Sequence, residues 1–159
     1  MQFNQLLTSL KDPALQTRWR VRMPDEDYPF QVMAESVEFS TRNVAAKQRM
    51  AMGKAWSFPD SSTLDGITIV FYETYDWSVT NYLAKWDNLV RDENGNYGVP
   101  IDYEKTIVIE MLNYEDDSAI KSFEYVGVWP TEMGALSMTS EDPNGRVQIT
   151  QQFAVKEQK

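Results

Sequence analysis

The stretch GVWPTEMGALSM, residues 127–138, decides how this chain folds. It begins with Gly127, sets the bulky Trp129 against the turn-forming Pro130, continues with Thr131, and breaks again at Gly134 before apolar residues resume. Proline and glycine are the strongest local signals of a turn. The chain therefore places a large aromatic side chain at the mouth of a loop, where it serves either a binding site or the architecture.

Patterns typical of β-strands lie on both sides of this loop. In TRWRVRM, residues 17–23, apolar and arginine side chains alternate strictly, which predicts a strand with one buried face. A second alternating run covers residues 30–40, and ITIVFYE at 67–73 is rich in β-branched and aromatic residues. Further strand patterns cover residues 103–113, 122–129, 134–140 and 146–155. The sequence EDPNG predicts a hairpin turn between the last two.

The strongest helical pattern covers residues 76–95, where an apolar stripe recurs at helical spacing. Asp76 or Ser78 can serve as its N-cap, and Gly95 follows as a stop signal. A shorter amphipathic pattern at residues 1–14 predicts a second helix at the N-terminus.

These elements define the expected fold class. Strands dominate and do not alternate with helices, which excludes a parallel βαβ sheet. We therefore expect a mainly β fold, an antiparallel β-sandwich or partly open barrel with one central α-helix and a short N-terminal helix. Because the chain has no repeat and no linker, we expect a single domain over residues 1–159.

Residues 41–66 have no clean period, although they include Met50, Met52, Trp56 and Phe58. A long irregular segment in a compact domain is usually functional or flexible. A flexible segment would expose these large apolar side chains as an adhesive patch. An extended arm or hairpin that packs on a partner removes this conflict.

The residue types present exclude several kinds of chemistry. The chain has no Cys and no His, so it can form neither a disulfide, a Cys/His zinc site nor a Ser-His-Asp triad. The acidic pair Asp102 and Glu104 and the acidic run at 115–117 have no spacing typical of a catalytic pair or an EF-hand. DENGNYG at 92–98 lacks a terminal acidic ligand and is expected to be a loop that ends the helix. We therefore expect no enzyme, no cofactor and no metal site.

The charge balance bears on possible partners. With 24 acidic and 15 basic residues, the net charge of −9 disfavours a nucleic-acid-binding face, and the arginines of RWRVR fit a solvated or protein-facing edge. No apolar run is long enough to span a bilayer, so we expect no membrane partner. The N-terminal sequence lacks the pattern of a signal peptide, and we expect a protein made and kept in a cytoplasm.

With these elements in place, GVWPTEMGALSM resembles the G-x-W-P-T-x-x-G-x-L signature of tail tube proteins from contractile-tailed bacteriophages. The resemblance extends over about residues 15–155. RWRVRMP and YPFQVMAESVEFST are similar to the first two strands of that family, and AWSFPDSSTLDGITIVFYETYDWSVTNYLAKWDNLV is similar to its strand–helix unit. IDYEKTIVIEML resembles the family's x-x-Y-K-K approach to the next strand, with Glu104 in place of the first lysine.

The resemblance implies a structural subunit of the virion, assembled in the host cytoplasm. Six copies would form a ring whose inner strands join into a continuous β-barrel, and the rings would stack into a hollow tube inside a contractile sheath. The tube would contact sheath, baseplate and tape-measure proteins and conduct DNA into the host without binding it specifically. Related subunits form the tubes of type VI secretion systems and phage-tail-like bacteriocins. Residues 1–14 would form a helical arm, and residues 41–58 take the place of the family's inter-subunit arm.

Several features of the sequence fit this picture. A closed barrel between subunits removes exposed strand edges, and an acidic wall repels the DNA that passes. Trp129 would then be a wedge beside the loop at 130–134 that fixes how two strands leave one sheet for the other. Alternation identifies two polar strand faces that could line the channel: Ser36, Glu38 and Ser40 on one strand, and Gln148, Thr150 and Gln152 on another.

Two alternatives remain open. The polar EDPNGR turn and the C-terminal FAVKEQK depart from family members that end in an aromatic-acidic tail, so the same fold could serve as a baseplate tube initiator or a tube terminator. From a different class, a monomeric β-sandwich could bind a ligand through the five Trp and eight Tyr residues. Rings or filaments at high protein concentration would distinguish a tube subunit from a binding module.

Overall fold

The computed structural model describes residues 18–24, 34–132, 135–138, 141 and 145–159. The expected N-terminal helix and Gly134 lie outside the described residues. Within them, no helix is both long and apolar enough to cross a membrane.

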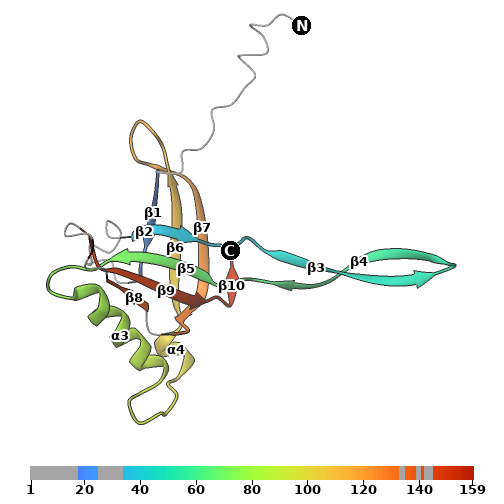
Figure 1. Ribbon diagram of the computed structural model, residues 1–159. Coiled ribbons are helices and arrows are strands. Elements are labelled where there is room, and N and C mark those ends of the chain that lie inside the picture. Colours follow the sequence, from blue (N-terminus) through green and yellow to red (C-terminus); the bar gives the residue numbers. More distant parts are fainter. Residues whose placement is uncertain (1–17, 25–33, 133–134, 139–140, 142–144) are drawn as a thin grey trace, which may run out of the picture.

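The fold is mainly β, as predicted, and every strand pair in it is antiparallel. The principal sheet runs in the order β1 (Trp19–Arg22), β6 (Lys105–Leu112), β7 (Ala119–Pro130), β9 (Gln148–Ala154), β5 (Ile67–Tyr72), β2 (Ala34–Glu38). Two short strands join it: β10 (Glu157–Gln158) pairs with β7, and β8 (Ala135–Ser137) pairs with β9. In Figure 1 the strands β1, β6 and β7 cross β2, β5 and β9, which gives a sandwich-like body. Over the described residues the sheet does not close into a barrel.

Strand β7 belongs to both layers of this body. Its residues up to Val128 pair with β6, whereas Trp129 and Pro130 pair with Ala154 and Phe153 of β9. The change of partner follows Gly127, whose φ of 67° lies in the left-handed region that favours glycine. A Cβ atom at this position would lie 2.6 Å from Cβ of Lys156. Gly127 therefore both bends the strand and admits the neighbouring chain.

Alternating side chains from the two layers meet in a single core. Every second residue of β5 is buried, beginning with Ile67, and the same alternation holds along β9 from Ile149 to Phe153. The core comprises Val21, Met23, Ile67, Ile69, Phe71, Val79, Tyr82, Leu83, Trp86, Ile107, Ile109, Tyr125, Val128, Ile149 and Phe153. Burial of this apolar surface is the main stabilising contribution to the fold.

The predicted central helix is confirmed as α3 (Ser78–Val90). It turns Val79, Tyr82, Leu83 and Trp86 toward the core, and the ring of Trp86 lies 5.3 Å from that of Phe153. Trp86 Nε1 donates a hydrogen bond of 2.8 Å to the carbonyl of Tyr103. That bond ties α3 to the short helix α4 (Pro100–Tyr103), which the sequence did not predict.

The N-terminus of α3 differs from the prediction. The N-cap is Trp77, in a left-handed conformation and without a side-chain cap, rather than Asp76 or Ser78. The carboxylate of Glu73 accepts instead from the backbone N–H groups of Val79 (3.2 Å) and Thr80 (2.9 Å). Burial alone would raise the pKa of Glu73, but its hydrogen bonds with Thr80, Thr74 and Val79 outweigh burial and hold the pKa below the usual value. Glu73 thus satisfies helix N–H groups that have no partner within the helix.

Candidate assembly surfaces

A long hairpin projects from the body (Figure 1). It consists of β3 (Asn43–Ala51) and β4 (Lys54–Thr63), which pair only with each other in the described sheets. Met52 and Gly53 connect them with φ angles of 53° and 73°, the combination that a type I′ turn requires. Nine residues at the rise of a β-strand span about 30 Å. The expected segment at 41–58 therefore contains β3, the tip and the first half of β4, but the hairpin continues to Thr63.

The apolar side chains singled out in the sequence all lie on this hairpin. Their exposed fractions are 74% for Met50, 104% for Met52, 56% for Trp56 and 48% for Phe58. Every residue of both strands is exposed. Side chains of this size on a projecting element are typical of an interaction surface.

The body offers a second surface, on the side of β2, β5 and β9 that faces away from the core. The register places Glu38, Thr68 and Gln152 in one row and Ser36, Val70 and Thr150 in the next. Gln148 continues this face and donates a hydrogen bond of 2.6 Å to Glu35. The structure therefore brings five of the six predicted polar residues onto one face of one layer.

Ser40, the sixth residue, does not share that face. Strand β2 ends at Glu38, and beyond it the chain turns so that Oγ of Ser40 is buried. The Ser40 carbonyl accepts a hydrogen bond of 2.9 Å from the hydroxyl of Tyr125. The predicted alternation failed here because it assumed a strand that continued through Ser40.

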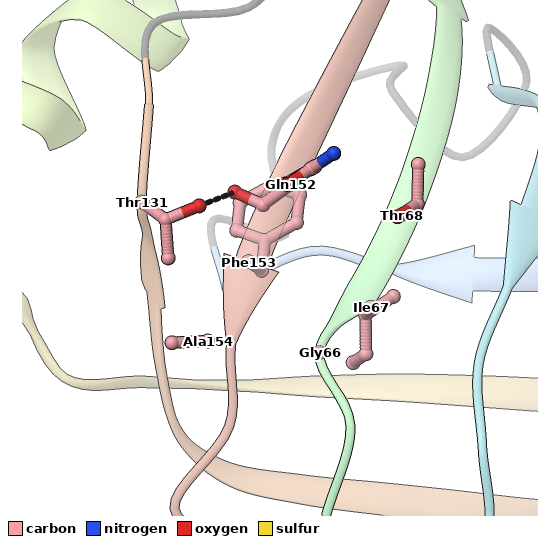
Figure 2. A pocket seen from close by; sticks show the side chains of 7 residues that line it. All are labelled: Gly66, Ile67, Thr68, Thr131, Gln152, Phe153 and Ala154. Atoms are coloured by element: carbon pink, nitrogen blue, oxygen red, sulfur yellow. Dashed lines mark hydrogen bonds between the residues drawn. The ribbon is translucent and has the colours of Figure 1, made fainter.

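The signature loop sits where β7 changes its partner strand. Trp129 is half-buried, with its ring 6.2 Å from that of Tyr103, and Pro130 is buried. Beyond it, the N–H and the hydroxyl of Thr131 donate to the carbonyl of Gln152 at 3.1 and 3.3 Å (Figure 2). These contacts hold the chain against the edge of β9, to which β8 returns three residues after Glu132.

A buried glutamine that sequence reasoning missed supports this loop. Gln151 is 1% exposed, and its Nε2 donates to the carbonyls of Glu132 (2.5 Å) and Gln152 (2.9 Å). Its Oε1 is buried without a partner among the described residues. A glutamine at an inward position of β9 was the available signal, because a polar residue at a core position requires hydrogen bonds.

Solved structures with the same arrangement identify the fold. A chain of the PVC sheath/tube terminator from an extracellular contractile injection system superposes with a TM-score of 0.73 and 16% identity, over 94% of this chain and 97% of that one. A chain of the tube-terminating cap of the anti-feeding prophage superposes with a TM-score of 0.70 and 18% identity, over 95% of this chain and 92% of that one. A chain of the PVC sheath–tube complex superposes with a TM-score of 0.69 and 16% identity, over 99% of this chain and 96% of that one. The chain has the fold of contractile injection system components. No protein-family model and no curated protein sequence matches it.

A shallow depression of about 350 Å³ lies at one end of the β5–β9 pair (Figure 2). It is lined by Gly66, Ile67, Thr68, Thr131, Gln152, Phe153 and Ala154. A Cβ on Gly66 would lie 2.5 Å from the carbonyl oxygen of Phe153, so the glycine is required for strand packing. Phe153 is the one aromatic residue among these lining residues, and its side chain is buried in the core.

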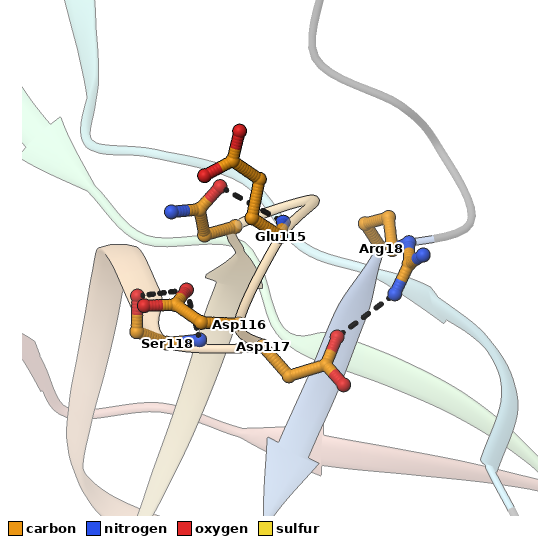
Figure 3. A network of polar contacts seen from close by, with 6 residues as sticks. Arg18, Glu115, Asp116, Asp117 and Ser118 are labelled. Atoms are coloured by element: carbon orange, nitrogen blue, oxygen red, sulfur yellow. Dashed lines mark hydrogen bonds and ion pairs between the residues drawn. The ribbon is translucent and has the colours of Figure 1, made fainter.

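The acidic turn between β6 and β7 is held by hydrogen bonds within the turn and by an ion pair with Arg18 at the start of β1 (Figure 3). Asp117 forms an ion pair of 2.8 Å with Arg18. The carboxylate of Asp116 accepts hydrogen bonds from the hydroxyl (2.7 Å) and the N–H (3.2 Å) of Ser118. These bonds from Ser118 are the main reason that the pKa of Asp116 lies below its usual value. Among the described residues, no group of three or more acidic side chains could hold a metal ion. Asp116 and Asp117 therefore stabilise the turn through these contacts.

Proposed function

We propose that this chain is a structural subunit of a contractile tail tube, and that it forms hexameric rings that stack into a hollow tube inside a sheath. The observation that carries the proposal is the fold itself, shared over nearly the whole chain with components of contractile injection systems. In this role it would contact the sheath, baseplate and tape-measure proteins of a phage or phage-tail-like particle.

The edges of one layer supply a mechanism for ring closure. In the layer β8–β9–β5–β2, the strands β8 and β2 are the outermost described strands. An unpaired strand edge favours pairing with another chain. If β8 of one copy pairs with β2 of the next, the layer continues around the ring as a closed barrel, which has no edges.

The polar face of that layer would then line the channel. It carries Ser36, Glu38, Gln148, Thr150 and Gln152, with no hydrophobic residue larger than Val70 in the two central rows. The two central rows contain no lysine or arginine with which to neutralise phosphates, and Arg146 lies at the end of the face, 5.0 Å from the ring centroid of Tyr72. We therefore expect DNA to pass without specific binding.

The projecting hairpin would connect one copy to the next. An isolated two-stranded hairpin is marginally stable in water, and Trp56 and Phe58 are 56% and 48% exposed. A heterologous contact with a neighbouring copy would cover them and could be repeated along a ring or a stack.

Negative-stain microscopy of the purified protein across a concentration series tests the proposal. We expect rings or tubes with a central hole, and Trp56→Ala should weaken their stacking. Tyr114→Ala, which removes an exposed aromatic residue far from the hairpin in the sequence, is the matched control. A protein that stays monomeric at every concentration, and also in the presence of preformed tube ends, would contradict the proposal.

A tube terminator or a baseplate initiator of the same fold is the alternative, favoured by the terminator and the cap being among the structures that superpose well. Microscopy separates the two functions, because a terminator would form single rings that do not stack with one another.

A further inference from the structure

The register of the hairpin sorts its residues into two chemically different faces. Paired residues of antiparallel strands point to the same side, and successive residues point to opposite sides. Lys47 pairs with Phe58, Arg49 with Trp56, and Ala51 with Lys54. One face, here called the cationic face, therefore carries Lys47, Arg49, Lys54, Trp56 and Phe58. The opposite face carries Ala46, Gln48, Met50, Ala55, Ser57 and Pro59.

The cationic face has the opposite charge to the rest of the chain. The hairpin, residues 43–63, includes three basic residues and one acidic residue, Asp60, whereas the whole chain has 24 acidic residues against 15 basic ones. All three cations are exposed, and none forms an ion pair with the part of the chain that the structure describes. The hairpin consequently has a net positive charge, and the rest of the chain carries the excess negative charge.

We propose that the cationic face docks on the body of a second copy of this chain, which carries an excess of acidic residues. The inference rests on the proposed function, since it takes the hairpin as the element that joins copies, and it adds which face makes the contact and why. Burial of Trp56 and Phe58 would supply most of the affinity, because aromatic side chains bury the largest apolar area. Lys47, Arg49 and Lys54 would set the orientation and accelerate encounter with an acidic partner.

Nucleic acid is the other class of partner that cations interleaved with aromatics can bind. The composition disfavours it, since three cations neutralise few phosphates and a longer strand would lie against a body with excess negative charge. In contact with a second copy, the same excess negative charge attracts the cationic face of the hairpin.

The test compares two triple variants with the same change in net charge. Lys47→Gln/Arg49→Gln/Lys54→Gln neutralises the cationic face, and Ala46→Glu/Gln48→Glu/Ala55→Glu adds three acids to the opposite face at positions that do not pair with one another. All six positions are exposed and outside the core, so both variants should keep the unfolding midpoint of the wild type. Analytical ultracentrifugation at low and high salt gives the concentration at which copies associate.

We expect neutralisation of the cationic face to raise that concentration about tenfold at low salt and to flatten its salt dependence, since exposed ion pairs are individually weak and screened. The opposite-face variant should change it less than about threefold. A carbodiimide, which joins amines to carboxylates in contact, should link Lys47 or Lys54 to acidic residues of another copy. Mixing isotopically labelled and unlabelled protein identifies links between copies.

Equal effects of the two triple variants, or the absence of links from Lys47 and Lys54 between associated copies, would overturn the inference. So would binding of a single-stranded oligonucleotide that depends on the three cations and competes with self-association. Rings that form equally well with the cationic face neutralised would refute this inference and leave the tube proposal standing. Salt-dependent association through the hairpin that produces no rings would support this inference and contradict the tube proposal.

Discussion

Replacing Gly127 with alanine should destabilise the body strongly, because this glycine lets β7 pass between the two layers. Its φ of 67° is unfavourable for any residue with a Cβ, and the added Cβ would lie 2.6 Å from Cβ of Lys156. The backbone conformation alone costs about 1–2 kcal/mol. Overpacking against the base of a neighbouring side chain adds about 1–3 kcal/mol. We therefore expect Gly127→Ala to lower the free energy of unfolding by about 2–5 kcal/mol.

The hairpin tip provides a matched control. Gly53 has a comparable φ of 73°, but a Cβ there would have no atom within 4 Å. Because the hairpin lies outside the core, Gly53→Ala should lower the unfolding free energy of the body by less than about 1 kcal/mol. Urea denaturation of both variants, followed by tryptophan fluorescence at concentrations where the protein is monomeric, measures the difference.

A second substitution separates the two contributions at Gly127. Lys156→Gly removes the three side-chain carbons that the new Cβ would meet. Combined with Gly127→Ala, it should recover about 1–3 kcal/mol of the loss and leave the cost of the backbone conformation. Additive effects of the two substitutions, or equal losses for Gly127→Ala and Gly53→Ala, would refute the reasoning that a steric contact with Lys156 enforces glycine here.

Three further predictions concern the core and the loop. Glu73→Gln should cost about 1 kcal/mol at neutral pH. The pKa of Glu73 in the folded protein lies below its usual value of 4.5, so the stabilisation by its carboxylate is complete above that value and is lost as the pH falls through the lowered pKa. Between about pH 5 and 3 the Glu73→Gln variant should therefore lose less stability than the wild type, as urea unfolding at each pH would show. Trp86→Phe should cost about 1–3 kcal/mol through the lost Nε1 bond and lost volume, whereas Trp56→Phe on the exposed hairpin should cost less than about 0.5 kcal/mol; equal urea midpoints would contradict this. Gln151→Leu should change global stability by less than about 1 kcal/mol, because it removes two hydrogen bonds but also a buried acceptor without a described partner, while hydrogen exchange at the Thr131 amide should become faster; unchanged exchange would show that Gln151 does not hold the loop.

The elements that face the core were predictable from the sequence. Burial on one side imposes alternation on β5 and β9 and a helical stripe on α3, and these patterns identified all three. The hairpin shows no such period because both of its faces are exposed and no core selects their residues. Its aromatic and methionine content indicated an arm, but its end at Thr63 could not be predicted.

Other features depend on contacts between distant residues, which a single sequence does not contain. Glu73 was missed as a cap because capping residues are sought at the N-cap itself, whereas its carboxylate reaches the helix from five residues before Ser78. Helix α4 is only four residues long, too short for a helical period. The sequence placed both Ser36 and Ser40 on the polar face, and the structure places only Ser36 there. The difference arises because β2 ends at Glu38, and the chain beyond it is fixed by the hydrogen bond between Ser40 and Tyr125, which the sequence does not show.

The continuity of β7 through both layers has a mechanical consequence. In a sandwich held together by side chains alone, a lateral load can slide one layer over the other. Here residues 119–130 form one covalent rod that is bonded to β6 along most of its length and to β9 at its end. Displacing the layers would require stretching that rod or shearing several hydrogen bonds at once. The body should therefore resist deformation as one stiff unit, with bending concentrated near Gly127.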